Sequence, residues 1–248
     1  MSRRRVLGPV ASSPPVSVIL PTYNERDALG KLYPALAPVV TALGGEVFVV
    51  DDGSPDGTAA FARTLKGPPA PSVVERPGPP DLARAVLEGI GRSRAEVVVV
   101  MDSDGSHPPE AVPLLVRAVA SGAAELAIGS RRVPGGRGSA APSRRLVSAA
   151  ARVLARPLTR ARDPMSGLFA VRRSVLERAP LAPIGYKIGL EVLVRCRPRP
   201  VLEVPITARP RLAGSSKFDR REVTKYLRHL TRLYAWRFGP PRRASSTR

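Results

Sequence analysis

The chain has 248 residues, of which 43% are hydrophobic and one is a cysteine. This length and apolar content suffice for one sizeable core and do not require two domains. A single cysteine excludes a disulfide framework and a cysteine-based metal cluster, and it suits a reducing compartment. No apolar run reaches about 18 residues, and the start of the chain lacks the apolar stretch of a secretory signal, so we expect neither a transmembrane helix nor export.

The formal net charge of +20 is concentrated in the second half of the chain. Residues 1–130 contain 12 Lys and Arg against 14 Asp and Glu, whereas residues 131–248 contain 28 against 6. Such asymmetry indicates a polyanionic partner, which could be a nucleic acid, an anionic membrane surface or a phosphorylated substrate. Arginine outnumbers lysine by 35 to 5, however, so a coding bias is a second explanation for part of the basicity.

The spacing of apolar residues predicts alternating strands and helices after a basic, Pro- and Ser-rich lead-in at residues 1–15. The expected strands cover 16–20, 47–50, 72–76 and 96–101, and the expected helices cover 27–43, 58–66 and 81–92. This order implies an α/β fold with a doubly wound, mostly parallel sheet and flanking helices, because parallel neighbours need right-handed helical crossovers. We expect one domain over 16–238 and a disordered tail over 239–248.

Three of the predicted strands run directly into polar motifs, namely PTYNE (21–25), DDGSPDG (51–57) and DSDGS (102–106). The last motif follows four valines, which are typical of a strand buried on both faces of a parallel sheet. Asp102 and Asp104 flank one residue, so extended backbone points both carboxylates the same way at the ligand-binding edge of the sheet. The pair therefore predicts a Mg²⁺ or Mn²⁺ site that bridges to a diphosphate.

Each acidic motif taken alone is also compatible with a turn or a helix cap. The chain contains neither GxGxxG nor GxxxxGK[ST], so a dinucleotide fingerprint and a P-loop are both excluded. The histidines are not predicted to act in catalysis. His107 precedes Pro108 and Pro109 and is interpreted as a helix-entry residue, and His229 is interpreted as a surface residue of a basic helix.

Two basic amphipathic helices are predicted in the second half, over 144–162 and 220–238. Each places apolar residues on one face with arginines around it, an arrangement that suits a membrane interface carrying anionic headgroups. Trp236 and Phe238 are candidate interfacial anchors. The alternative is that both helices pack on the sheet with solvated charged faces.

Further motifs in the second half are GSR (129–131), DPMSG (163–167), GYK (185–187), EVPI (203–206) and RLAGSSK (211–217). Together with the three acidic strand ends, their order resembles the dolichol-phosphate mannosyltransferases, a branch of the family 2 inverting glycosyltransferases. The resemblance covers residues 16–235. The sequence differs from the family pattern in the segment 76–85, where the family usually has a Gly- and Lys-rich loop. The role of this segment is therefore not predicted.

The resemblance implies a GT-A fold and inverting transfer of mannose from GDP-mannose to a polyprenyl (dolichyl-type) monophosphate, with Mg²⁺ or Mn²⁺ as cofactor. The nucleotide would bind to residues 16–131, and residues 132–238 would face the acceptor and the membrane. The residues implied for the nucleotide sugar are Pro21, Tyr23, Glu25, Val50, Asp52, Asp102, Ser103, Asp104, Arg131, Arg211 and Lys217. Those implied for the metal are Asp102, Asp104 and Ser106, and those implied for catalysis are Asp102, Asp104 and Arg131.

The resemblance further implies a peripheral protein on the cytoplasmic face of a membrane, and it is compatible with a membrane-anchoring partner protein.

The chemistry of the implied reaction agrees with the residues assigned to the site. A leaving GDP gains negative charge that a divalent cation, Arg and Lys stabilise, whereas the attacking phosphate is already ionised and needs no strong base.

Two alternatives are retained. The first is a related family 2 transferase that uses UDP-glucose or another acceptor. The second is a nucleic-acid-binding protein that uses the basic second half. Aromatic residues make up only 4% of the chain, and no helix-turn-helix, zinc or RNA-recognition pattern is visible, so a nucleic acid partner is not expected.

Overall fold

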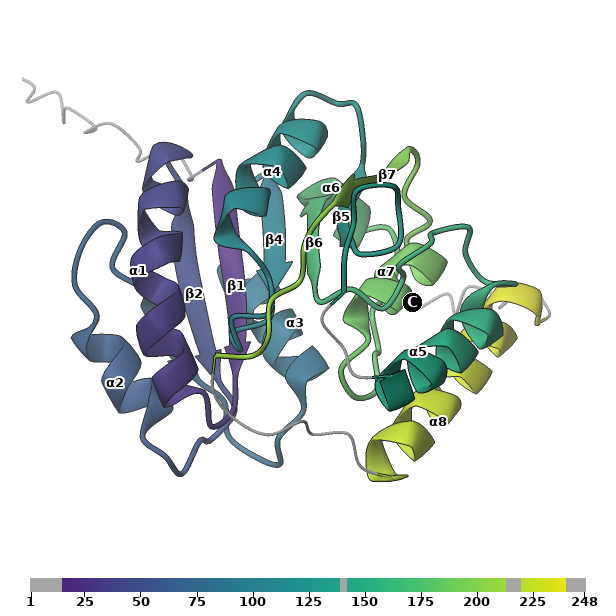
Figure 1. Ribbon diagram of the computed structural model, residues 1–248, viewed down its shortest axis with the longest axis horizontal. Coiled ribbons are helices and arrows are strands. Elements are labelled where there is room, and N and C mark those ends of the chain that lie inside the picture. The colour runs from purple at the N-terminus through teal and green to yellow at the C-terminus, as the bar shows by residue number, and fades with distance from the viewer. Residues whose placement is uncertain (1–14, 139–141, 213–219, 240–248) are drawn as a thin grey trace, which may run out of the picture.

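A computed structural model describes residues 15–138, 142–212 and 220–239 (Figure 1). The strands are β1 (Val16–Thr22), β2 (Glu46–Asp51), β3 (Ser72–Glu75), β4 (Val97–Met101), β5 (Leu126–Ser130), β6 (Leu168–Arg172) and β7 (Val201–Pro205). The helices are α1 (Arg26–Ala42), α2 (Thr58–Thr64), α3 (Leu82–Arg92), the 3-10 turn η1 (Pro109–Ala111), α4 (Val112–Ala120), α5 (Pro142–Ala155), α6 (Arg173–Leu176), α7 (Ile188–Arg195) and α8 (Arg220–Phe238). The expected lead-in and tail lie outside the described residues, apart from Pro15 and Gly239.

The strands of the described ranges form a seven-stranded sheet in the order β3-β2-β1-β4-β6-β5-β7. Only β6 runs antiparallel to its neighbours in this sheet, so the prediction of a mostly parallel α/β sheet is confirmed. The chain builds outward from β1 through β2 to β3 and then returns to place β4 on the other side of β1. The carboxyl ends of β1 and β4 therefore flank the point where the strand order reverses, which is where open α/β sheets bind ligands.

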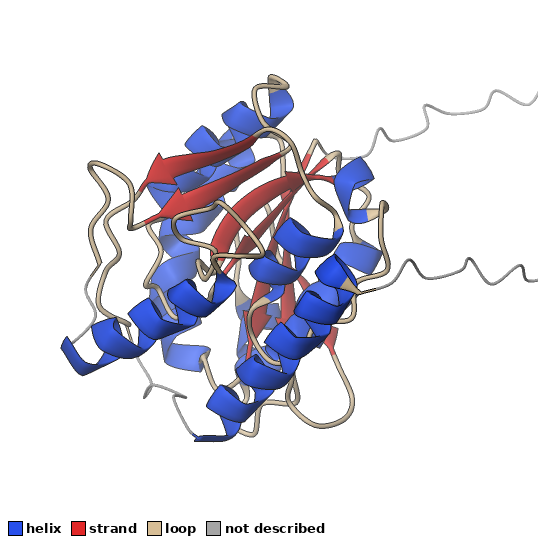
Figure 2. Cartoon of the chain, turned by 90° about the vertical axis from the view of Figure 1, so that its right-hand side faces the viewer, coloured by secondary structure: helices blue, strands red, loops and turns tan. Residues whose placement is uncertain are grey.

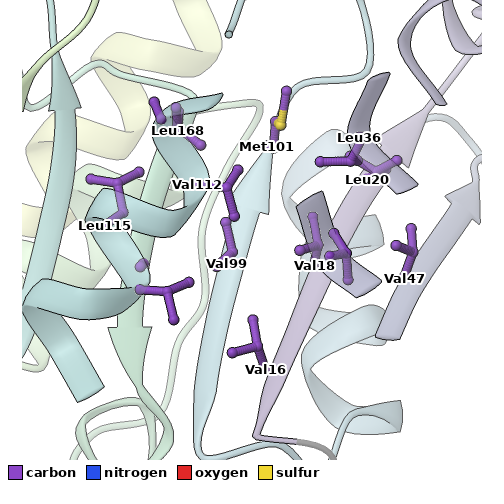
Figure 3. Close-up of a cluster of buried hydrophobic side chains, with 14 of the residues drawn as sticks. Val16, Val18, Leu20, Leu36, Val47, Val99, Met101, Val112, Leu115 and Leu168 are labelled. Carbon is purple, nitrogen blue, oxygen red and sulfur yellow. The ribbon is translucent and has the colours of Figure 1, made fainter. Parts of the chain in front are cut away.

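Helices cover both faces of the sheet (Figure 1). The helices α1 and α4 pack on one face, where Val97, Val99 and Met101 of β4 point, as Figure 3 shows for Val99 and Met101. The helices α3, α6 and α7 pack on the other face, where Val98 and Val100 point. The prediction that the valine run is buried on both faces is confirmed. Full burial of one such side chain contributes about 1.5–3 kcal/mol.

A third apolar cluster joins α5, α7 and α8 at the side of the molecule remote from α1 and α2 (Figures 1 and 2). Two tyrosines of α8 hold α5 beside it. Tyr226 donates a 2.7 Å hydrogen bond to the carbonyl of Ala151, and Tyr234 donates one of the same length to the carbonyl of Leu154. Each of the two basic helices therefore packs against the protein with one of its faces only.

The first helix of this pair is shorter than predicted. The expected helix 144–162 ends at Ala155, because Pro157 has no backbone N–H and disfavours helical geometry at Arg156. The expected helix 220–238 is confirmed over its whole length. Within the described ranges, no helix combines the length and the apolar character that spanning a bilayer requires.

Candidate active site

A pocket of about 370 Å³ opens at the carboxyl ends of β1, β2 and β4. The start of α3, the loop before α7 and the first turns of α8 complete its wall. The residues predicted from the sequence that line this pocket are Pro21, Tyr23, Glu25, Asp52, Asp102, Ser103, Asp104 and Arg211. The fold thus brings together side chains from both halves of the chain.

Asp102 follows β4 and presents a carboxylate that is 34% exposed to this pocket. Its Oδ2 lies 3.4 Å from the Nε2 of the buried His107. Gly167 also packs against this carboxylate, since a Cβ at residue 167 would come within 2.0 Å of Oδ2. Asp102 can keep this position only while residue 167 has no side chain.

Opposing effects set the pKa of Asp102. Burial raises this pKa, but the hydrogen bond to His107 and the charges of Lys187 and Arg211 outweigh the effect of burial and bring the pKa below its ordinary value. Asp102 is therefore ionised at neutral pH. His107 precedes η1, as its interpretation as a helix-entry residue predicted, and it also contacts the site, which the sequence pattern did not indicate.

Asp104 lies deeper in the pocket, with a side chain that is 7% exposed. Its Oδ1 accepts a 2.9 Å hydrogen bond from the backbone N–H of Ser106, and its Oδ2 pairs with the Nε of Arg211 at 3.0 Å. The backbone carbonyl of Asp104 accepts a 2.9 Å hydrogen bond from the N–H of Leu212. The segment after β7 is therefore fastened to the acidic motif.

Ser103, between the two carboxylates, links β4 to β1. Its buried hydroxyl donates a 2.8 Å hydrogen bond to the carbonyl of Pro21. This contact fixes the backbone between Asp102 and Asp104 against the PTYNE segment. The spacing of the two acids is thus held by a strand neighbour as well as by local geometry.

Asp52 closes the β2 side of the pocket and contacts the segment 76–85. Its Oδ1 accepts a 2.5 Å hydrogen bond from the Nε of Arg76, and its Oδ2 accepts one from the backbone N–H of Asp81. Burial raises the pKa of Asp52, which these two contacts partly offset. Asp81 also caps α3 by accepting hydrogen bonds from the N–H groups of Ala83 and Arg84. The segment 76–85 therefore positions the Asp52 carboxylate.

Arg131 is held beside the pocket by a bidentate ion pair. Its Nε and Nη2 donate to Asp163 at 2.8 and 2.9 Å. The backbone N–H groups of Arg162 and Asp163 in turn donate to the Glu203 carboxylate at 2.7 and 2.9 Å. Burial lowers the pKa of Arg131, but Asp163 and Asp102 outweigh it and keep this guanidinium charged. The GSR, DPMSG and EVPI motifs thus form one connected unit.

Besides Arg131, two predicted residues do not line the pocket, and one more is not described by the structure. Val50 is buried in the apolar cluster beneath α3, and its carbonyl accepts a hydrogen bond from the Thr22 hydroxyl. Ser106 follows Asp104 and contributes the backbone N–H described above. Lys217 lies outside the described residues.

Four residues that the sequence analysis gave no role belong to the site. Tyr186, Glu222 and Lys225 line the pocket, and Glu222 pairs with Lys225 at 2.7 Å. The Nζ of Lys187 lies 4.2 Å from the centre of the Tyr186 ring and 3.4 Å from the carbonyl of Met165. Burial lowers the pKa of Lys187 to about 8, although the nearby charge of Asp102 acts in the opposite direction. The GYK motif was the available signal for this pair.

The oxygen ligands available at the pocket suit a hard divalent cation. Asp102 and Asp104 offer carboxylate oxygens, which Mg²⁺ and Mn²⁺ prefer. The described residues contain no group of three or more His, Cys, Asp or Glu that could hold a metal ion. A cation bound here would therefore complete its shell with oxygens from water or from a bound diphosphate.

Comparison with known proteins identifies relatives over most of the chain. The family model described as "Glycosyl transferase family 2" matches residues 17–179. The dolichol-phosphate mannosyltransferase of Pyrococcus furiosus is 41% identical over 89% of this chain, which spans 64% of that protein's length. The protein of the same name from Saccharomyces cerevisiae is 36% identical, with 90% of this chain and 88% of the yeast protein covered. The polyprenol monophosphomannose synthase of Mycolicibacterium smegmatis is 41% identical, with coverages of 83% and 82%.

Solved structures show the same fold. Glucosyl-3-phosphoglycerate synthase from Mycobacterium tuberculosis, in complex with Mn²⁺, UDP-glucose and phosphoglyceric acid, matches with a TM-score of 0.70. The match has 24% identity and covers 92% of this chain and 81% of the other. The GT-A fold expected from the motifs is thereby confirmed. From its fold, the family match and relatives that are 34–41% identical, the chain belongs to glycosyl transferase family 2, in the branch of the dolichol-phosphate and polyprenol mannosyltransferases.

Proposed function

We propose that this protein transfers mannose from GDP-mannose to a polyprenyl monophosphate, with inversion at the anomeric carbon and with Mg²⁺ or Mn²⁺ as cofactor. The observation that carries the proposal is the single pocket in which Asp102 and Asp104 meet the nucleotide-side residues Tyr23 and Asp52. The named activity of the relatives supports mannose as the sugar and a polyprenyl phosphate as the acceptor.

The reaction requires the site to stabilise negative charge on the leaving diphosphate. The acceptor phosphate oxygen forms a bond to the anomeric carbon while the bond from that carbon to the β-phosphate oxygen breaks, and the electron pair leaves with GDP. The second pKa of a phosphomonoester is about 6, so the nucleophile is ionised without a protein base. Arg131 and Arg211 would stabilise the leaving diphosphate, and Asp163 keeps Arg131 in place for this role.

The divalent cation would be held by Asp102 and Asp104, with Ser106 beside them, and would supply Lewis-acid stabilisation of the leaving group. Other residues of this chain prepare that pair. His107 and Gly167 define the position of the Asp102 carboxylate, and Ser103 fixes the backbone between the two acids. Lys217 would hold a donor phosphate.

The acceptor is a lipid, so the protein must meet a membrane surface. We propose a peripheral location on the cytoplasmic face, with residues 16–131 binding the nucleotide and residues 132–238 facing the acceptor and the membrane. A membrane-anchoring partner protein is compatible with this arrangement. The exposed apolar side chains of α5 and α8, among them Val153, Leu154 and Leu227, support the proposal.

The proposal is tested with purified protein, labelled sugar nucleotides and a short-chain polyprenyl phosphate in detergent. GDP-mannose should yield polyprenyl-phosphate mannose with inverted configuration at the anomeric carbon, UDP-glucose should yield little product, and a chelator should stop the reaction until Mg²⁺ or Mn²⁺ is restored. Asp104→Asn should lower kcat at least about a hundredfold, because the site loses a carboxylate that neutralises the cation.

Glu110→Gln is the matched control, since it removes a carboxylate of the same segment whose only described partner is the exposed Arg209. This variant should keep activity within about twofold. Unchanged turnover by Asp104→Asn, or a product that retains the donor configuration, would contradict the proposal.

A further inference from the structure

A second cleft, of about 750 Å³, lies where the carboxyl-terminal ends of α5, α7 and α8 meet the start of β7. Five arginines line it: Arg156 and Arg160 after α5, Arg197 and Arg199 after α7, and Arg237 at the end of α8. Three segments that are distant in the sequence therefore bring like charges to one concave surface. We refer to this surface as the arginine cleft.

The lining of the arginine cleft contains no Asp or Glu. None of its five arginines forms an ion pair with a carboxylate of the described residues. Glu125 contacts the rim of the cleft, but its oxygens are taken by the guanidinium of Arg178 and by the backbone N–H of Arg199. The positive charge of the cleft is thus not compensated from within the part of the chain that the structure describes.

Contacts within the protein fix the two turns that carry four of these arginines. The Nη1 of Arg156 donates a 3.3 Å hydrogen bond to the carbonyl of Arg160, which closes the turn after α5. Arg197 adopts a left-handed φ of 49°, a conformation that is unfavourable for a residue other than glycine. Pro198 beside it is buried, so the turn that carries Arg197 and Arg199 is packed against the protein.

Several guanidinium groups around one cleft repel one another unless an anion lies between them. The planar fork of donors on each guanidinium matches the oxygens of a phosphate group, and arginine is the residue best suited to this recognition. A coding bias toward arginine could raise the number of such residues over the whole surface. It does not explain why five of them converge on one cleft whose lining lacks an acid.

The arginine cleft is separate from the active site. Glu222 and Lys225 of α8 line the active-site pocket, whereas Arg237 lines the arginine cleft. Arg237 lies 12 positions after Lys225 on α8, which corresponds to about 18 Å along the helix at about 1.5 Å per residue. The exposed ring of Phe238 lies under the Arg237 guanidinium at 5.2 Å, so an apolar side chain borders the cleft.

We propose that the arginine cleft is a second anion-binding site, which takes the phosphate group of a ligand other than the sugar donor. Two sources share this chemistry, namely the headgroup of an anionic phospholipid and a soluble phosphate or diphosphate. The site does not depend on the proposed transferase reaction, because none of its residues belongs to the active-site pocket.

The test measures the binding of two probes to the full chain at fixed ionic strength. One probe is inorganic pyrophosphate, followed by calorimetry, and the other is vesicles that contain phosphatidylglycerol, compared with vesicles of phosphatidylcholine alone. The cleft variant combines Arg160→Gln, Arg199→Gln and Arg237→Gln, one change from each segment. The control variant combines Lys66→Gln, Arg94→Gln and Arg117→Gln, which removes the same charge at exposed positions away from the cleft.

The cleft variant should bind at least one probe about tenfold more weakly than the unchanged protein, and the control variant should differ by less than twofold. The probe that responds identifies the source of the phosphate. Equal weakening by both variants would reveal a general charge effect and overturn the proposal, as would unchanged binding of both probes by the cleft variant. Thermal unfolding verifies that each variant is folded, and if the triple change unfolds the protein, Arg199→Gln with Arg237→Gln is measured in its place.

Discussion

Single residues determine the positions of the two carboxylates in the active site. Asp102 and Asp104 follow the end of β4, and Asp104 lies in a turn and not in the extended backbone that the sequence analysis assumed. The Asp102 carboxylate keeps its position because His107 contacts it and because Gly167 leaves room for it. Asp104 is fixed by the N–H of Ser106 and by Arg211. Small changes at the contacting residues should therefore also lower activity.

Replacing Gly167 tests this directly. In Gly167→Ala the new methyl group would lie within 2.0 Å of the Asp102 carboxylate, so the carboxylate must move. We expect mannosyl transfer to fall at least about tenfold and the free energy of unfolding to fall by about 1–3 kcal/mol, measured by enzyme assay and urea denaturation. Gly91→Ala is the control, since that helical position has open space and should gain up to about 1 kcal/mol. Equal effects of the two changes would refute the role of Gly167.

Lys187 should set the alkaline limit of activity. Burial lowers the pKa of its ammonium group to about 8, so the group is charged below pH 8 and becomes neutral as the pH rises through that value. The positive charge near Asp102 and Arg131 favours phosphate binding, so kcat/KM should fall with an apparent pKa of about 8. In Lys187→Met, activity at neutral pH should be lower and this alkaline decline should disappear. A decline that persists unchanged in Lys187→Met would assign it to another group.

At the level of elements, the attachment of α8 depends on a buried polar cluster. Glu191 of α7 is buried, and its Oε2 lies 2.6 Å from the Nε2 of His229 on α8. Its Oε1 pairs with Arg195 at 2.7 Å, and the guanidinium of Arg195 lies 4.4 Å from the centre of the Trp236 ring. The interpretation of His229 as a surface residue was therefore wrong, because α8 turns this side chain toward α7 and away from solvent.

Removing the Glu191 carboxylate should weaken the attachment of α8 to α7. Glu191→Ala leaves His229 and Arg195 buried without their carboxylate, which costs about 3–5 kcal/mol in the free energy of unfolding. Glu88→Ala, which breaks an exposed pair with Arg92, should cost under about 1 kcal/mol. Urea denaturation at pH 7 compares the two, and similar losses would contradict a structural role for the cluster.

The same cluster gives stability a pH dependence. Burial raises the pKa of Glu191, but the hydrogen bonds from His229 and Ala182 and the charge of Arg195 outweigh it, so the folded pKa lies below the ordinary value of 4.5. The stabilisation is therefore present above pH 4.5 and is lost as the pH falls through the lower folded value. The difference in stability between the unchanged protein and Glu191→Ala should shrink on acidification below pH 4.5.

At the scale of the whole molecule, the exposed face of α5 and α8 is the surface that we propose to contact a membrane. Val153, Leu154, Leu227 and Phe238 are 70%, 46%, 46% and 59% exposed, and each has an arginine within two positions in the sequence. The two helices that carry these side chains lie side by side (Figures 1 and 2). In the proposed contact, apolar insertion would add to the attraction of anionic headgroups.

Replacing Leu154 and Leu227 together with Gln should weaken binding to vesicles that contain phosphatidylglycerol by about tenfold, since each buried leucine contributes about 1 kcal/mol or more. Transfer to a short-chain acceptor in detergent should be unchanged, because neither residue lines the active-site pocket. The control changes Leu114 and Leu202 to Gln, two leucines of comparable exposure on α4 and β7. Vesicle binding that falls equally in both double variants would rule out a specific membrane face.

The local pattern of the sequence was enough to predict the first half of the fold and the central acidic pair. Alternation along β4 fixes which valines face each side of the sheet. Asp102 and Asp104 both line the pocket as predicted, but a turn after β4 brings them there and not the strand period. Helix spacing likewise predicted α1, α3 and α8. The strands β5, β6 and β7 were not predicted, and the antiparallel direction of β6 depends on how the chain returns through the sheet.

The contacts that hold the site residues in place were found only in the tertiary structure. Arg131 with Asp163, Asp52 with Arg76, and Asp102 with Gly167 join residues that lie between 24 and 65 positions apart. No periodicity links such positions, because their contact depends on which loops the folded sheet brings to one edge. The same holds for the five arginines of the second cleft, which the sequence presents only as part of a basic half. Local spacing determined the direction of side chains along each element, and packing between elements determined their partners.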